Sequence, residues 1–480
     1  MKKIWLASLI LASSTLATSQ SDFNTFPTPG YTLPEVGSSV GLIDQYKERF
    51  IGEKVYRQVQ RQLPVLHDPW LEDQLSITFS HILAQTQLGQ PIGMLIIKDP
   101  QINAFAVPGG LFALNLGLIN SARNMDEVAG VMAHEIAHVT QRHYSRSQED
   151  FKGQGLLALA GIVVGALVAS KADGDAGAAV MVGSQAALAD KQLSYSRNQE
   201  READRIGMQY MYSAGFNPHS MADFFEVMHR ATSRVSFLPD FWFTHPLTTE
   251  RMSEARLRAT QLPVVRTKIK DEQFNILKWY SLVLSNQTNE QQLKTLVKQK
   301  DQAATFALAA FYMKQTDYKA AQQTLDLLES KQKLETLYFL LQTDIYLQTN
   351  QVAKAFQTIS SPSRVMPENR ALAYKLAEVY LQQNDSVQAQ KVIKRFLDHN
   401  PRDVSGWELM QQAANIDAAH PLRAINVLRY RAEKEYWSGH EEAGIKSLLH
   451  AQRLAQSNDA MLNVVKERLS QMQKEYQQKI

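Results

Sequence analysis

The sequence predicts a mainly α protein, in which an α+β domain with a small sheet precedes an α-solenoid. Apolar residues recur at three- and four-residue steps in long stretches, as Leu71, Leu75 and Phe79 do, which is typical of amphipathic helices. Strand-like patterns occur within residues 93–118, and a 34-residue repeat occupies the C-terminal part. A chain of 480 residues is long enough for two or three such domains.

The composition excludes several classes of site. The chain has no cysteine, so disulfides, thiolate zinc sites, cysteine nucleophiles and lipid attachment at an N-terminal cysteine are ruled out. The net charge of +3 is close to balance and gives no sign of a nucleic-acid-binding protein.

The N-terminus is expected to be a signal peptide that covers residues 1–19. Two lysines precede an apolar run that is too short to span a membrane, and small residues at Ala17 and Ser19 allow cleavage near either position. The alternative is an uncleaved membrane anchor. Export in a bacterium predicts a periplasmic protein.

The next elements can be predicted in order. Residues 20–40 are rich in proline and form an irregular lead-in, and residues 43–87 have a helical pattern. Gly93–Ile97 is a short apolar run and is expected to be a strand. Alternating residues in Asn103–Val107 and Leu111–Leu118, on either side of a Pro-Gly-Gly turn, predict a hairpin.

The most informative motif is HEIAH. His134 and His138 are four residues apart, so on a helix both imidazoles lie on one face and can bind one metal ion. Glu135 can reach a metal-bound water as a general base, which is the HExxH pattern. Asn124 is expected to cap this helix, with Glu127 as the return half of a capping box. The alternative is a chance match on an ordinary helix.

A second motif decides between these interpretations. Glu200 and Asp204 are again four residues apart, so Glu200 can be a third metal ligand while Asp204 holds the far nitrogen of a histidine ligand. Three protein ligands with one open position are typical of a catalytic zinc site, and one zinc ion is predicted. On its own, this arginine-rich segment would be read as a solvated charged face.

Together these motifs resemble the HtpX-like and CAAX-prenyl-protease-like zinc metallopeptidases, which are gluzincins. The resemblance rests on HEIAH, on the E-x-E-A-D-x-x-G pattern from Glu200, on Asn103–Gly110, and on His245-Pro246 followed by Arg251. It covers roughly residues 40 to 260. The metzincin pattern is not met, because glutamine and tyrosine stand where that family has glycine and histidine.

The resemblance implies a reaction and roles for further residues. In an endopeptidase of this kind His134, His138 and Glu200 hold zinc, and Glu135 passes a proton from water to the leaving amine. His245 and Arg251 are expected to stabilise the developing oxyanion. His245 has a second role open to it, as a fourth ligand that closes the open position. The plainer alternative is a structural histidine and a salt-bridging arginine.

The resemblance also implies a substrate-binding strand. The strand at Asn103–Val107 is expected to bind an extended substrate by β-augmentation.

The apolar segment Gly155–Ala189 is rich in alanine and glycine and is expected to form a helical hairpin between the two metal-binding helices. It is either a buried core hairpin or a functional element near the site, namely a lid or a segment that touches the membrane.

The C-terminal part has the period of tetratricopeptide repeats. Tyr312, Tyr346 and Tyr380 are 34 residues apart, and a following alanine repeats in the same register at Ala321, Ala355 and Ala389. We therefore predict a peptidase domain over residues 20–265 and a solenoid over residues 266–480. The groove of the solenoid is expected to bind a peptide or a protein partner. The alternative is that the solenoid serves only as a dimerisation or packing module.

Two functions are considered. The first is a periplasmic zinc endopeptidase. The resemblance implies misassembled outer-membrane β-barrel proteins as its substrates, a role in assisting their assembly, and the β-barrel assembly machinery as a partner. The alternative is a chaperone or assembly scaffold, whose solenoid binds partners while the peptidase stays latent.

Overall fold

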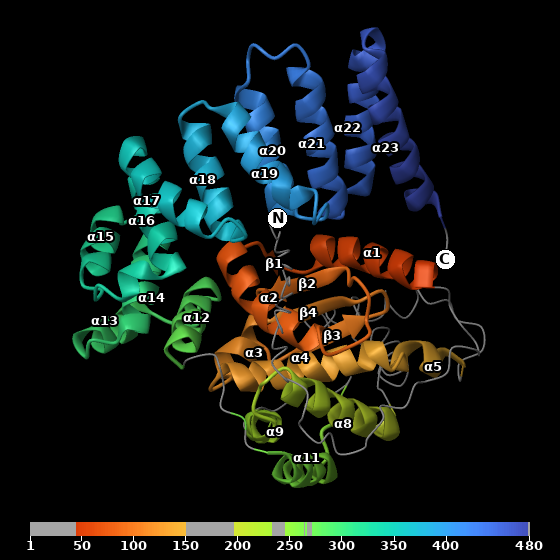
Figure 1. Cartoon of the computed structure of the whole chain (residues 1–480), viewed down its shortest axis with the longest axis vertical. Helices are drawn as coiled ribbons and strands as arrows, with labels where there is room; N and C mark the ends of the chain where they lie inside the picture. Colours follow the sequence, from red (N-terminus) through yellow and green to blue (C-terminus); the bar gives the residue numbers. More distant parts are fainter. Residues whose placement is uncertain (1–44, 150–195, 233–244, 264, 266–270, 479–480) are drawn as a thin grey trace, which may run out of the picture. The chain divides into compact units, whose positions relative to one another are not determined.

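The computed structural model describes residues 45–149, 196–232, 245–263, 265 and 271–478. Within these ranges the chain is mainly helical and has one four-stranded sheet, which confirms the predicted fold class (Figure 1). Among the described residues, no helix has both the length and the apolar character needed to cross a membrane. The predicted signal peptide and the predicted hairpin at Gly155–Ala189 lie outside the described residues, as does most of the linker at the predicted boundary between residues 265 and 266.

The first elements, up to residue 149, are α1 (Gln45–Gln62), β1 (Val65–Leu66), α2 (Pro69–Leu83), β2 (Gly93–Ile97), β3 (Ala104–Val107), β4 (Leu111–Asn115), α3 (Leu116–Ser121), α4 (Met125–Thr140) and α5 (His143–Glu149). They are followed by α8 (Arg197–Ser213), α9 (His219–Thr232) and α11 (Thr249–Gln261). The C-terminal helices are α12 (Asp271–Leu284), α13 (Glu290–Lys298), α14 (Gln302–Lys314), α15 (Tyr318–Asp326), α16 (Thr336–Gln348), α17 (Val352–Val365), α18 (Arg370–Gln382), α19 (Ser386–Leu397), α20 (Val404–Ile416), α21 (Arg423–Trp437), α22 (Glu441–Leu454) and α23 (Asp459–Gln477).

Two predicted boundaries were wrong. The helical pattern of residues 43–87 is broken, because Pro64 cannot continue a helix and Asp68 caps a new one that starts at Pro69. The second hairpin strand ends at Asn115 instead of Leu118. The chain turns into α3 there, and Gly117 approaches the backbone of Pro100 so closely that an added Cβ would lie 2.1 Å from its oxygen.

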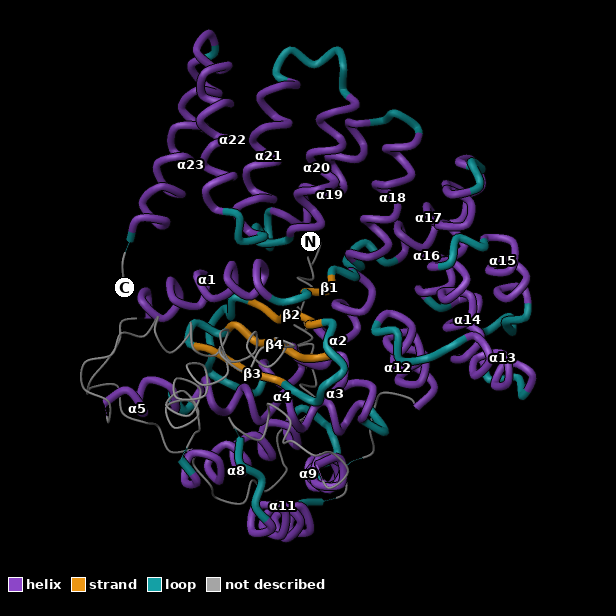
Figure 2. The backbone as a smooth tube through the Cα atoms, turned by 180° about the vertical axis from the view of Figure 1, so that it is seen from behind, coloured by secondary structure: helices purple, strands orange, loops and turns teal. Residues whose placement is uncertain are grey.

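The sheet has the strand order β1-β2-β4-β3, so β3 lies at an edge. β3 pairs antiparallel with β4, which confirms the predicted hairpin, and β2 runs parallel to β4. Side chains alternate between two faces, as the pleat requires. Ile96, Phe112 and Leu114 join the core that includes α2 and α4, whereas Leu95, Phe105 and Leu111 join the core that includes α1. Figure 2 shows the sheet between α1 and α4.

The 34-residue repeat corresponds to a repeated turn between paired helices. Thr316, Asn350 and Asn384 are 34 residues apart and have left-handed φ angles of 59°, 58° and 58°. In each turn the next backbone N–H donates to the carbonyl of the predicted tyrosine, over 3.0 Å for Tyr312, 2.7 Å for Tyr346 and 2.9 Å for Tyr380. This is the hydrogen-bond pattern of a Schellman motif, so each repeat is a helix pair that ends and restarts in the same way.

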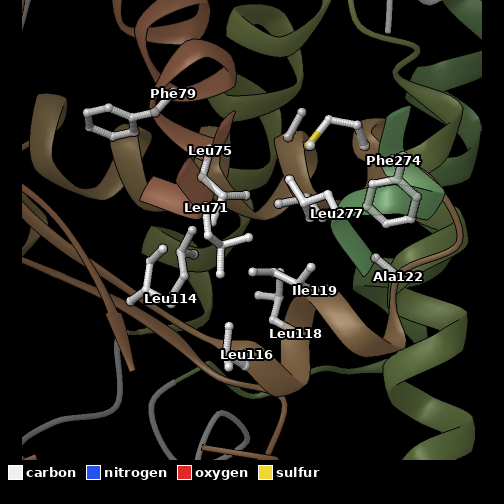
Figure 3. Close-up of a cluster of buried hydrophobic side chains, with 14 of the residues drawn as sticks. Leu71, Leu75, Phe79, Leu114, Leu116, Leu118, Ile119, Ala122, Phe274 and Leu277 are labelled. Carbon is white, nitrogen blue, oxygen red and sulfur yellow. The ribbon is translucent and has the colours of Figure 1, made fainter. Parts of the chain in front are cut away.

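The repeat helices share hydrophobic cores with the N-terminal part. Figure 3 shows one such cluster, in which Leu71 and Leu75 of α2 lie near Ile119 of α3 and near Phe274 and Leu277 of α12.

A second shared core joins α1 to the helices at the C-terminal end. In that core the Arg57 guanidinium lies 4.6 Å from the ring centroid of Tyr436 and 5.6 Å from that of Trp437. Its Nε donates to Glu441 over 2.5 Å. α1 is therefore held by α21 and α22 through apolar, cation–π and ionic contacts at once.

Candidate metal centre

Four buried side chains converge on one point in the structure. His134 and His138 come from α4, Glu200 from α8, and His245 from the segment before α11. One ligand atom of each residue lies within 4.8 Å of the other three. The structure thus brings together all four residues that the sequence predicted as metal ligands.

The two helices that carry the ligands begin at well-formed caps. Asn124 accepts a hydrogen bond from the Glu127 backbone N–H at the start of α4, as predicted. The carboxylate of Glu127 returns to the backbone N–H of Arg123 instead of that of Asn124, so the predicted capping box is displaced by one residue. α8 starts with a complete capping box between Ser196 and Gln199.

Close packing of α4 and α8 brings their polar faces together. At Gly207 an added Cβ would lie 2.9 Å from the backbone oxygen of Ala133 and 3.0 Å from the Cα of His134. A side chain there would push the helices apart. Because Asp204 and Glu200 lie about one and two turns before Gly207 on α8, this contact brings them within reach of the histidines.

The donor atoms of the four residues are within a few ångströms of one another. His138 Nε2 lies 3.0 Å from His134 Nε2 and 3.3 Å from Glu200 Oε1. His245 Nδ1 lies 3.0 Å from Glu200 Oε1, and its Nε2 lies 3.5 Å from Glu135 Oε1. Imidazole nitrogens and a carboxylate in one buried cluster are the donor set of a catalytic zinc site.

The electrostatics of the cluster favour a cation. Burial raises the pKa of Glu200, but the charges of His245 and Arg251 and hydrogen bonds from His134 and His138 outweigh burial and hold the pKa well below its usual value. Burial lowers the pKa of His134, but hydrogen bonds to Asp204 and Glu200 outweigh it and raise the pKa to about 10. The residues present therefore fit a bound metal ion.

Asp204 lies where the sequence predicted it. Its Oδ1 is 2.9 Å from His134 Nδ1, the ring nitrogen on the far side from the cluster. A carboxylate accepts only, so this contact places a ring hydrogen of His134 on Nδ1 and turns Nε2 toward the cluster, where it is the nitrogen available to a metal ion.

Glu135 is buried beside the cluster and is not one of its four donors. Burial raises the pKa of its carboxyl group, while the charges of His245 and His134 act against that rise. A carboxylate with a raised pKa can take a proton and give it up again, as a general base must.

Arg251 is bound by the carboxylates around it. Its Nε and Nη2 donate to the two oxygens of Asp204 over 2.7 and 2.8 Å, and Nη1 donates to the Pro246 carbonyl over 2.9 Å. Nη1 also lies 2.6 Å from Glu200 Oε2. The role as an oxyanion donor stays a prediction, while these contacts favour a role for Arg251 in holding Asp204 and Glu200.

Sequence reasoning missed one residue of this site. His143 is fully buried at the start of α5, and its Nδ1 lies 3.0 Å from His138 Nδ1. Its Nε2 lies 3.0 Å from Glu202 Oε2 on α8. The sequence feature that could have identified His143 is its position, five residues after the second histidine of HEIAH.

Comparisons with known proteins agree with this site. The model of "Peptidase family M48" matches residues 69–259, which include every predicted site residue. The "Beta-barrel assembly-enhancing protease" of Escherichia coli K12 is 31% identical over 392 residues, which are 80% of this chain and 80% of that protein. The "Putative beta-barrel assembly-enhancing protease" of Vibrio cholerae is 28% identical and covers 79% of this chain and 80% of that protein. The "Metalloprotease LoiP" of Escherichia coli is 27% identical over 38% of this chain and 68% of its own length. The chain therefore belongs to peptidase family M48 and is a metalloendopeptidase.

Proposed function

We propose that the chain is a zinc-dependent endopeptidase of the bacterial periplasm that degrades misassembled outer-membrane β-barrel proteins and assists their assembly. The observation that carries the chemistry is the buried cluster of His134, His138 and Glu200 with Glu135 beside it. The names of two relatives that match most of the chain, in Escherichia coli and Vibrio cholerae, support a place in β-barrel assembly.

His134, His138 and Glu200 would hold one zinc ion, which when bound supplies a Lewis acid to the reacting carbonyl and water. Asp204 keeps His134 in the tautomer that presents Nε2. Arg251 holds both Asp204 and Glu200 in place. Glu135 takes a proton from the attacking water and gives it to the leaving amine.

β3 is the proposed binding edge for substrate. It is an edge strand, and it packs against the helix that carries HEIAH. An unpaired strand edge offers N–H and C=O groups to an extended chain. A β-barrel protein that has failed to assemble offers such chains, which fits the proposed substrate class.

Removal of single ligands tests the metal site. We expect His138→Ala and Glu200→Ala to lose bound zinc on dialysis, because two protein ligands hold zinc far less tightly than three. Metal content measured by atomic emission checks this, with wild type retaining about one zinc ion per chain. If both variants keep a full complement of zinc, His138 and Glu200 are not metal ligands.

His245 is proposed to act as a latch, with an oxyanion donor as the alternative. Its Nδ1 lies 3.3 Å from His134 Nε2 and 3.0 Å from Glu200 Oε1, which is where a fourth ligand would stand. As a latch it competes with water for the metal, so His245→Ala should raise cleavage of casein and self-cleavage. As a donor alone, its loss should lower turnover by about 100-fold or more. Activity as low as that of Glu135→Gln, with zinc retained, would contradict the latch.

The C-terminal helix pairs are proposed to be tetratricopeptide repeats that form a partner-binding domain over 266–480. Their period and identical turns support this. The β-barrel assembly machinery is the proposed partner.

We also propose that residues 1–19 are a cleaved signal peptide and that the segment Gly155–Ala189 contacts the membrane or the active-site cleft.

A further inference from the structure

We propose that His143 is a positioning residue for the metal centre, and that it fixes the tautomer of His138 by accepting a hydrogen bond from that ring. The inference rests on the proposed function, because it takes His138 as a metal ligand. It assigns to His138 an outer partner that matches the one Asp204 provides for His134.

The backbone explains how a residue five positions after His138 reaches it. In a continuous helix the fifth residue would point away from the metal-binding face. α4 instead ends at Thr140, and Arg142 adopts a left-handed conformation with φ 53°. α5 then starts at His143, so the chain folds back and His143 packs against His138, with the two ring centroids 4.9 Å apart.

The hydrogen bonds leave one consistent set of tautomers. His138 Nε2 faces the cluster, so a bound cation requires its lone pair and places the ring hydrogen on Nδ1. Nδ1 must then donate, and His143 Nδ1, which is 3.0 Å away, must accept. The hydrogen of His143 is therefore on Nε2, 3.0 Å from a Glu202 carboxylate that only accepts. The rings of His138 and His143 each carry one hydrogen in this arrangement.

Other contacts hold His143 in place. Gln199 Nε2 donates to the backbone oxygen of His143 over 3.1 Å, and this bond is buried. Arg146 donates to the same Glu202 oxygen over 3.0 Å, which keeps that carboxylate directed at the ring. Because Gln199 and Glu202 lie on both sides of Glu200 along α8, the same helix supplies a predicted ligand and the support for His143.

A purely structural role is the competing explanation, since a buried, hydrogen-bonded histidine also stabilises the corner between α4 and α5. The two roles differ in what they predict for the metal. A positioning residue changes metal affinity and ligand geometry, and outer partners of histidine ligands typically contribute about 10- to 100-fold in affinity. A structural residue changes stability alone.

The test compares two substitutions of the same shape in the full-length chain. Leucine and asparagine have the same branched side chain, but only asparagine places an oxygen where His143 Nδ1 lies. Tyr210→Phe is the matched control, because its hydroxyl joins α8 to the end of α4 by a bond to Thr140 over 3.2 Å and no ring of the cluster is involved. Zinc affinity is measured by competition with a chromogenic chelator, and ligand geometry by the visible spectrum of the protein loaded with Co²⁺.

We expect His143→Leu to bind zinc about 10- to 100-fold more weakly and to shift the Co²⁺ bands. We expect His143→Asn and Tyr210→Phe to stay close to wild type in both. The proposal is overturned if His143→Leu behaves like Tyr210→Phe, or if His143→Asn is as weak as His143→Leu. If the leucine variant does not fold, Glu202→Ala replaces it, and unchanged zinc affinity there also overturns the proposal.

His138→Ala separates this proposal from the proposed function. If His138→Ala loses zinc and His143→Leu binds it as tightly as wild type, the positioning role of His143 is contradicted and the metal site is not. Zinc fully retained by His138→Ala contradicts the metal site itself.

Discussion

Glutamine in place of Glu135 is expected to abolish peptide hydrolysis while the protein keeps its metal. Glu135 is buried beside the cluster and contributes none of its four donor atoms, so the substitution leaves the predicted ligands unchanged. Glutamine has the same shape but cannot take a proton from water. A positioned general base contributes about 10²- to 10⁴-fold to a rate, and a loss at the upper end is expected here because the same group also protonates the leaving amine.

The measurement is cleavage of casein beside metal content. Glu226→Gln is the control, because Glu226 lies on the neighbouring helix α9, is half exposed and is paired with Arg256. It should cleave at the wild-type rate. Hydrolysis by Glu135→Gln within a few-fold of wild type would remove Glu135 from the mechanism.

The same variant distinguishes a protease from a scaffold. In a strain that lacks the gene, Glu135→Gln should fail to restore the clearance of misassembled β-barrel proteins. If it restores every function of the missing protein, the chain acts mainly as an assembly factor and its peptidase is latent.

The second large effect is expected at Arg251, where leucine should destabilise the fold and weaken metal binding together. Arg251 is buried and forms ion pairs with both Asp204 and Glu200. Removing one partner of a buried ion pair costs about 3–5 kcal/mol, because the charge left behind stays buried without compensation. Lysine should restore only part of the loss, since an ammonium group cannot make the two parallel bonds to Asp204.

The free energy of unfolding of the metal-free protein in urea measures this effect. Arg256→Leu is the matched control on the same helix, since Arg256 is only half-buried and its ion pairs with Asp223 and Glu226 are partly accessible to solvent. Surface pairs contribute about 0–1 kcal/mol, so the control should unfold near wild type. Wild-type stability of Arg251→Leu, with a fall in turnover alone, would instead support the oxyanion role.

Local spacing explains how much of the fold and the site could be predicted from sequence. His134 with His138, and Glu200 with Asp204, are four residues apart, and helix geometry alone puts each pair on one face. The strand at Gly93–Ile97 and the repeated turns also depend on near neighbours in the chain.

The features that were missed depend on contacts or conformations that spacing does not determine. His143 reaches His138 only because Arg142 takes a left-handed conformation, which arginine rarely does. The pairing of Arg251 with Asp204 depends on how α11 packs against α8. The break at Pro64 could have been found, since a proline followed by an Asp-Pro cap is a local signal.

The core that α1 shares with the C-terminal helices has a consequence for biogenesis. The chain is made from its N-terminus, yet the apolar face of α1 and one face of the sheet are covered in part by Val404, Tyr436, Trp437 and other residues near the C-terminus. The peptidase part therefore cannot complete its packing until almost the whole polypeptide has emerged. Nascent or truncated chains would remain incompletely packed, so the peptidase would become active only once its own C-terminal helices are in place.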